Sequence, residues 1–170
     1  RRPASPHEHV VTSPLSRDVV ETRLASVGLT LGASVPPQGL YHPVRVHDGV
    51  AWVSGHTGRD AGRPRHRGVI GESVTVDEAL DEARHAAVNL LAALEGAELL
   101  PRVAAVLHLR GYLRAHSEFT EHPSVVNAAS EVIVLALGAT VGVHARTAVG
   151  VHSLPGGAPV ELEAVVALTS

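Results

Sequence analysis

The sequence lacks cysteine and lysine and is poor in aromatic residues, and each shortage excludes a class of chemistry. Without cysteine there can be no disulfide, thiolate nucleophile or cysteine-ligated zinc. All fourteen basic residues are arginine, so a Schiff-base lysine and a phosphate-loop lysine are also excluded. One Trp, two Tyr and one Phe are too few for a base-stacking platform. Together with the formal charge of −3, this argues against a nucleic-acid partner.

Long hydrophobic runs are missing as well. No stretch of about 18 consecutive apolar residues occurs, so neither a transmembrane helix nor a membrane partner is expected. Arg1 and Arg2 are followed by no apolar segment, so a secretory signal is not expected either. These absences favour a cytoplasmic location.

The chain does contain a 45% apolar fraction, mostly Val, Ala and Leu, which suits helices packed on a sheet. Its 170 residues fit one domain of ordinary size. Residues 1–16 hold prolines, serines and histidines without periodicity, and they are expected to form a flexible N-terminal tail. Residues 17–170 are expected to form a single domain.

Local patterns predict the elements of the first half of that domain. Apolar residues at helical spacing predict a short helix over 17–27. The Asp48–Gly49 dipeptide between two apolar runs predicts a hairpin over 44–54. Residues 55–71, rich in Gly and Arg, are expected to form a loop long enough to be functional.

Two longer helices and a strand are expected next. Thr75 and Glu78 form a capping box ahead of one apolar stripe, which predicts a helix over 76–95. Alternating residues over 103–113 predict a strand. Pro123 in a first turn and Gly138 after the last turn predict a second helix between them.

The C-terminal segment carries charges inside strand-like apolar runs. The runs 142–151 and 160–167 flank a Pro-Gly-Gly sequence, which predicts a β-hairpin. Arg146 lies on the first run, and Glu161 and Glu163 lie on the second. Charges on adjacent strands destabilise a protein unless they pair or meet a ligand. The pattern therefore leaves two possibilities open, a cross-strand ion pair or a binding site.

The predicted order of elements indicates an α+β fold. A mixed β-sheet would carry the two long helices on one face. No further helix is available to cover the other face, so we expect other subunits of an oligomer to cover it.

The small neighbours of Arg146 favour the binding-site interpretation. On a strand over 145–151, Arg146 shares a face with Ala148 and Gly150, which leaves room for a ligand beside the guanidinium. Arginine is suited to bidentate capture of a carboxylate. Glu161 could orient or deprotonate a water molecule.

Histidines raise the question of metal or acid–base catalysis. None of the twelve forms a His-Glu-x-x-His motif, and His7 and His9 lie in the predicted tail, so neither a metal nor another cofactor is predicted. Ser54 and His56 do not fit a nucleophile elbow. His56 could be a general acid or base, or simply a hydrogen-bonded histidine at the end of a strand.

A short basic patch, residues 63–67, lies in the predicted loop. It could contact RNA, or it could be a solvated loop, which the negative net charge and the few aromatic residues favour.

Several separated blocks, in the right order, resemble the Rid (YjgF-type) superfamily of reactive-intermediate deaminases. The resemblance runs from about residue 29 to residue 168. It is carried by Pro37-Gln-Gly-Leu-Tyr41, Val53-Ser-Gly-His56, Val126-Asn-Ala128, His144-Ala-Arg-Thr147, Leu154-Pro155 and Val160-Glu-Leu-Glu-Ala164. The longer spacing between these blocks and the added N-terminal helix resemble those of a less-characterised branch of the superfamily.

This resemblance implies a homotrimeric barrel similar to chorismate mutases, with clefts between subunits, and hydrolysis of imines or enamines. Arg146 would hold the substrate carboxylate, and Glu161 would bind the attacking water. Tyr41, Ser54 and Asn127 would line the same cleft, although Tyr41 and Asn127 could also be structural. Such a hydrolase needs no metal, because the imine carbon is already electrophilic.

Two positions depart from the deaminase pattern and would alter the polarity of the cleft. Ala148 stands where cysteine is frequent, and His56 stands where glutamine is common. A tailoring enzyme of specialised metabolism, acting on a larger substrate, is therefore an alternative. A non-catalytic trimer that binds a carboxylate metabolite is another.

Overall fold

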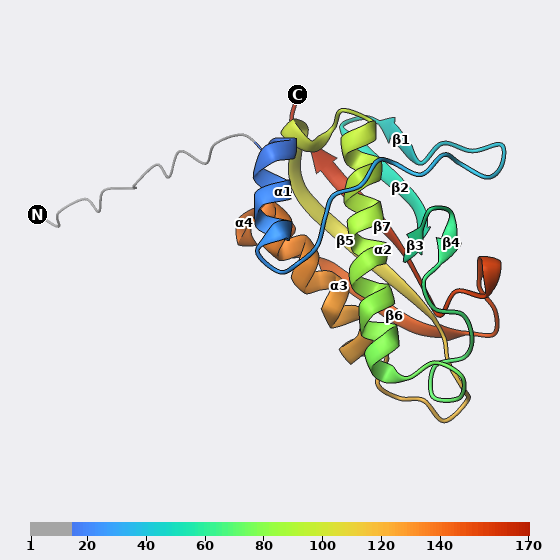
Figure 1. Ribbon diagram of the computed structural model, residues 1–170. Coiled ribbons are helices and arrows are strands. Elements are labelled where there is room, and N and C mark those ends of the chain that lie inside the picture. The colour runs from blue at the N-terminus through green and yellow to red at the C-terminus, as the bar shows by residue number, and fades with distance from the viewer. Residues whose placement is uncertain (1–14) are drawn as a thin grey trace, which may run out of the picture.

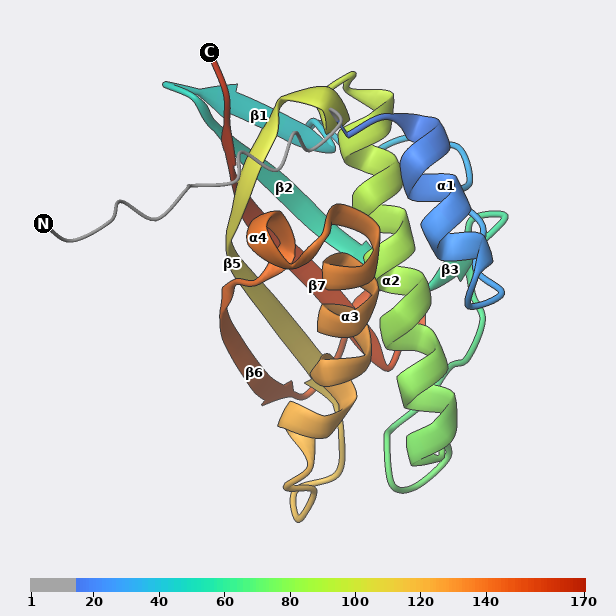
Figure 2. The same cartoon turned by 90° about the vertical axis from the view of Figure 1, so that its left-hand side faces the viewer.

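A five-stranded mixed sheet with helices on one face forms the body of the protein in the computed structural model, which describes residues 15–170 (Figures 1 and 2). The strand order is β1-β2-β7-β5-β6. These strands are β1 (Val44–His47), β2 (Val50–Thr57), β5 (Val103–Arg114), β6 (Ala145–Val151) and β7 (Val160–Leu168). The helices are α1 (Arg17–Ala25), α2 (Val76–Gly96), α3 (His122–Leu137) and the short α4 (Ala139–Gly142). The predicted α+β fold is confirmed, whereas the tail predicted for 1–16 lies almost entirely outside the described residues.

The long helices form where the sequence predicts them, because their caps and apolar stripes are local signals. The Thr75 Oγ1 accepts a hydrogen bond from the Glu78 amide at 3.2 Å, and Glu78 Oε2 accepts one from the Thr75 amide at 2.8 Å. Leu91 and Leu94 of α2 are fully buried, and each such side chain contributes about 1.5–3 kcal/mol on leaving water. Figure 2 shows α1, α2 and α3 together on one side of the sheet.

The predicted N-terminal hairpin is also confirmed. Asp48 and Gly49 have φ values of 47° and 72°, the left-handed conformation that a tight two-residue hairpin turn requires. Strand β2 nevertheless continues to Thr57, and a small ribbon follows, formed by β3 (Arg59–Asp60) and β4 (Arg63–Pro64). Part of the segment 55–71 that was expected to be a loop is therefore extended and paired.

The predicted C-terminal hairpin is wrong. β6 and β7 are not neighbours, because β5 lies between them and pairs parallel with β6 and antiparallel with β7. The chain leaves β5, crosses through α3 and returns as β6, and a crossover of this kind makes parallel strands. The short 3₁₀ turn Pro155–Gly157 then leads β7 into the gap between β2 and β5 rather than back beside β6.

The register places the two predicted catalytic residues on opposite faces of the sheet. Arg146 lies opposite Leu109, which is buried beneath the helices, so Arg146 is on the helix-covered face. Glu161 and Glu163 flank the fully buried Leu162, so they are on the helix-free face. On that face Trp52 remains 54% exposed. Among residues 15–170, no helix combines the length and the apolar character needed to cross a bilayer.

Candidate functional site

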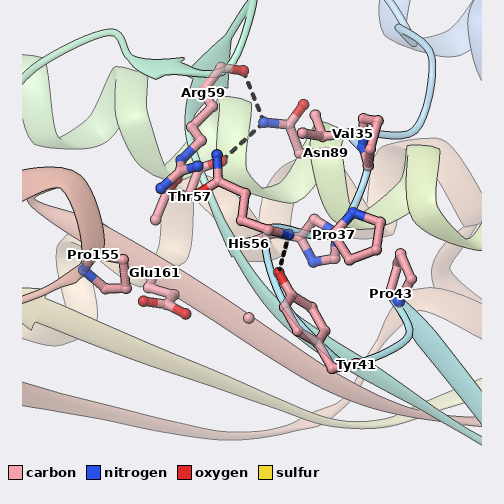
Figure 3. A pocket seen from close by; sticks show the side chains of 13 residues that line it. Val35, Pro37, Tyr41, Pro43, His56, Thr57, Arg59, Asn89, Pro155 and Glu161 are labelled. Carbon is pink, nitrogen blue, oxygen red and sulfur yellow. Dashed lines mark hydrogen bonds between the residues drawn. The ribbon is translucent and has the colours of Figure 1, made fainter.

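A cavity of about 210 Å³ lies where the ends of β2 and β7 meet the segment 35–43 and the Pro155–Gly157 turn (Figure 3). It brings together three of the predicted site residues, Tyr41, His56 and Glu161. Its full lining is Val35, Pro36, Pro37, Gln38, Tyr41, Pro43, Gly55, His56, Thr57, Arg59, Asn89, Pro155 and Glu161. The volume is below the roughly 300–1,000 Å³ of drug-sized sites and suits a small metabolite.

The Glu161 carboxylate is free in this cavity. No described residue gives it a hydrogen bond or an ion pair. Burial raises its pKa above that of an ordinary glutamate, the charge of Glu163 raises it further, and the charge of Arg59 opposes both effects. Gly55 makes room for this side chain, because a Cβ on residue 55 would overlap Glu161 Oε1 and lie 3.0 Å from its Cδ. A glutamate with these properties can accept a proton from a water molecule near neutral pH.

Glu163, two residues further along β7, is instead hydrogen-bonded to neighbouring side chains. Its Oε1 accepts hydrogen bonds from Arg110 Nη1 at 2.7 Å and from the Tyr112 hydroxyl at 3.0 Å. The cross-strand ion pair on this face is therefore Arg110–Glu163. The alternative in which Arg146 pairs with Glu161 is excluded, because the two side chains lie on opposite faces.

His56 is a hydrogen-bonded histidine near the end of β2, and it also lines the cavity. Its Nδ1 lies 2.6 Å from the backbone oxygen of Ser54, and since a carbonyl only accepts, Nδ1 carries the proton. Burial lowers the pKa of this imidazole, which outweighs the opposite effect of that hydrogen bond. The ring is consequently neutral at pH 7 and keeps an unprotonated Nε2 as a hydrogen-bond acceptor.

Arg59 is a cavity residue that the sequence did not reveal. Its Nε donates to Thr57 Oγ1 at 3.1 Å. Asn89 of α2 donates from Nδ2 to the backbone oxygens of Thr57 and Arg59, at 2.8 and 3.0 Å, as Figure 3 shows. Asn89 carries a signal that could have been noticed, since it is the one polar residue in the apolar run 86–94. Arg59 carries no such signal.

Arg146 belongs to a second group, between β6 and α3. Its Nη1 donates to Asn127 Oδ1 at 2.6 Å and to Ser130 Oγ at 3.1 Å. The Ser130 hydroxyl in turn lies 3.0 Å from His144 Nε2, and His144 Nδ1 lies 2.6 Å from the Gly142 backbone oxygen. Burial and the charge of Arg146 lower the pKa of His144. A neutral His144 therefore accepts from Ser130, and this chain of bonds fixes the guanidinium.

The remaining predicted residues are Ala148 and Ser54. Ala148 lies on the same face as Arg146 and packs against the core. Ser54 Oγ donates to the His42 backbone oxygen at 2.7 Å, and Ser54 lines a separate hollow on the helix-free face. One chain thus places Glu161, Tyr41 and His56 around the cavity, and Arg146, Ala148 and Asn127 between α3 and the helix-covered face of the edge strand β6. A small ligand cannot contact both groups within one chain.

Residues 21–158 match the family model described as "YjgF/chorismate mutase-like, putative endoribonuclease". A relative, Protein TCP17 of Trypanosoma cruzi, is 34% identical over 152 residues, which are 89% of this chain and 95% of that protein.

Solved structures agree with this match. The protein Atu1372 from Agrobacterium tumefaciens, described as of unknown function, has a TM-score of 0.83 and 35% identity, covering 90% of this chain and 94% of that one. A protein from Shewanella oneidensis described as a putative endoribonuclease has a TM-score of 0.81 and 27% identity, and the match covers 88% of this chain and 99% of that one. The YjgF gene product from Escherichia coli shares the fold, with 20% identity and a TM-score of 0.57. The match covers 81% of this chain and 94% of that one.

Proposed function

Because the chain belongs to the YjgF/chorismate mutase-like family, the Rid superfamily that its motifs resemble, we propose that it hydrolyses a small imine or enamine bearing a carboxylate. The site would be a cleft between subunits of a homotrimer. The observation that carries this proposal is the Glu161 carboxylate, which has a raised pKa and no partner among the described residues of its cavity.

The chemistry assigns one proton transfer to Glu161. Its carboxylate takes a proton from a water molecule as the water oxygen bonds to the imine carbon, and the C=N electron pair moves to nitrogen. The nitrogen of the resulting carbinolamine receives that proton back from Glu161 and a second one from the hydroxyl group, and it leaves as ammonia while the hydroxyl oxygen becomes the carbonyl of a 2-oxo acid. The neutral His56, through its free Nε2, accepts a hydrogen bond from the attacking water or the substrate nitrogen.

Arg146 would hold the substrate carboxylate from a neighbouring subunit. Within one chain it lies on the opposite face of the sheet from Glu161, on the edge strand β6, which β5 separates from β7. A head-to-tail contact between the surface that carries Arg146 on one copy and the surface that carries Glu161 on the next generates a ring when the rotation closes. Such a ring would bring Arg146 of one copy to Glu161 of the next. It would also cover exposed apolar residues such as Trp52 on the helix-free face.

RNA cleavage receives less support from the basic patch 63–67. Arg65 pairs with Asp81 at 3.1 Å, and His66 lies 3.3 Å from the same carboxylate. Acidic neighbours therefore already neutralise part of this patch. We expect no RNA cleavage when the purified protein is incubated with single-stranded RNA.

The test is the release of pyruvate from 2-iminopropanoate generated in the assay by an amino-acid oxidase. We expect acceleration by the wild-type protein, a loss of about 100-fold or more in the Arg146→Ala and Glu161→Gln variants, and wild-type rates in Arg63→Ala, an exposed arginine outside both groups. No acceleration by the wild type, together with no change in Arg146→Ala, would contradict the proposal. Binding of the product pyruvate without turnover would instead indicate a metabolite-binding trimer.

A further inference from the structure

The guanidinium of Arg59 lies at the junction of two cavities. One is the cavity of about 210 Å³ that contains Glu161, and the other is an open hollow of about 620 Å³ between the segment 32–38 and the β3–β4 ribbon. Both are lined by Val35, Pro36, Pro37, Gln38, Arg59 and Asn89. A ligand whose reacting carbon is beside Glu161 can therefore extend towards Arg59.

The backbone at Arg59 is rigidly held, which lowers the entropic cost of using this arginine as a binding group. Asn89 anchors the backbone on both sides of Gly58, and Thr57 holds the Arg59 Nε. Gly58 packs directly on α2, because a Cβ there would lie 2.7 Å from the Glu82 backbone oxygen. These contacts occupy Nε and leave the two terminal nitrogens of Arg59 without a hydrogen bond to any residue in 15–170.

The charge of Arg59 is not neutralised by the part of the chain that the structure describes. Asp60, the adjacent acid, pairs with Arg65 instead. Glu161 is near enough for the positive charge of Arg59 to lower its pKa, yet the two groups form no ion pair. His56, on the same wall, is neutral. An arginine with this environment is suited to bind an anionic group of a ligand.

We propose that the substrate carries a second carboxylate, bound by Arg59, and is therefore a dicarboxylic 2-imino acid. This inference rests on the proposed function, in which Arg146 of a neighbouring subunit holds the carboxylate next to the imine carbon. The space between Arg59 and Glu161 then accommodates the carbon chain that joins the imine carbon to the second carboxylate. A singly charged carboxylate fits better than a phosphate dianion, because Glu161 would repel the greater negative charge more strongly.

The experiment compares two substrates that differ in the second carboxylate, 2-iminosuccinate from aspartate and 2-iminopropanoate from alanine. Wild-type kcat/KM is expected to be higher for 2-iminosuccinate. The Arg59→Gln variant should lose about 10- to 100-fold on 2-iminosuccinate and remain within about twofold on 2-iminopropanoate. Arg59→Lys, which keeps the charge, should lose less on 2-iminosuccinate. Arg63→Gln, on the same ribbon, should change neither rate.

The assay is run on the alkaline side of the pH profile, so that an altered pKa of Glu161 does not affect the comparison. Succinate should inhibit the wild type competitively and inhibit Arg59→Gln more weakly. Equal losses on both substrates, or no loss on 2-iminosuccinate, would overturn the role of Arg59 and leave the proposed function intact. No turnover of either substrate by the wild type would instead refute the proposed function.

Discussion

Replacing Gly55 with alanine should disable Glu161 without destabilising the fold. The new Cβ would overlap Glu161 Oε1 and lie 3.0 Å from Cδ, where unstrained carbon atoms stay about 3.5–4.0 Å apart. Because Oε1 overlaps the new atom, the carboxylate must move by about 1 Å or more. A misplacement of about 1 Å in a catalytic group can reduce the rate about 100-fold, so we expect kcat/KM for imine hydrolysis to fall by about 10- to 100-fold.

Stability should respond differently to the same substitution. Gly55 does not have the positive φ that disfavours side chains, and the atoms that the new methyl group meets belong to a flexible side chain. A Gly-to-Ala change at such a position stabilises by about 0.4–1 kcal/mol, through the unfolded state. The melting temperature of the variant should therefore stay level or rise while its activity falls.

Gly32→Ala is the matched control, since a Cβ at residue 32 meets no atom within 4 Å. Both variants are assayed for imine hydrolysis and for thermal unfolding. A Gly55→Ala protein with kcat/KM within about twofold of wild type would refute the assigned position of Glu161. Equal losses of activity in both glycine variants would also refute it.

Two further predictions follow from the buried carboxyl groups. Because only ionised Glu161 accepts the proton and burial raises its pKa, the rate should fall with decreasing pH through a value above that of an ordinary glutamate. The Arg59→Gln variant should shift this fall to higher pH, and an unchanged profile would contradict the assignment. Burial also raises the pKa of Glu82, which is fully buried. A raised folded-state pKa means that stability is lost as pH rises through it. The Glu82→Gln variant keeps an acceptor for the His66 amide. Its melting temperature should therefore exceed that of the wild type by more at pH 7 than at pH 4. A difference in melting temperature that does not change with pH would contradict this reasoning.

The elements that the sequence predicts correctly are those determined by contacts close in the chain. The capping box of Thr75 and Glu78 and the Asp48–Gly49 turn involve neighbouring residues. The failed C-terminal hairpin shows the limit of such signals. Its Pro-Gly-Gly turn is real, but the crossover through α3 places β6 beside β5, and β7 takes the position between β5 and β2. The order of strand, long helix and strand does indicate that β6 pairs with β5, because this order favours a parallel pair.

Local sequence signals predict the candidate site only in part, for the same reason. Glu161 and Glu163 are equivalent in the alternation of β7, and only the contacts from β5 distinguish them, because Arg110 and Tyr112 bind Glu163. The motifs of the resemblance did identify Arg146 and Asn127, which the structure brings into contact. Ser130 and Arg59 depend on how distant segments pack, so no local pattern indicates them.

The most direct test of the central claim, that a working site combines Glu161 of one subunit with Arg146 of another, is a mixture of two inactive variants. Arg146→Ala and Glu161→Gln proteins are unfolded together in equal amounts, refolded, and assayed for imine hydrolysis. In a randomly mixed ring each subunit boundary has about a one-in-four chance of holding both intact residues, so the mixture should recover about a quarter of wild-type activity. Refolded trimers that remain as inactive as the separate variants would show that the site is not shared between subunits.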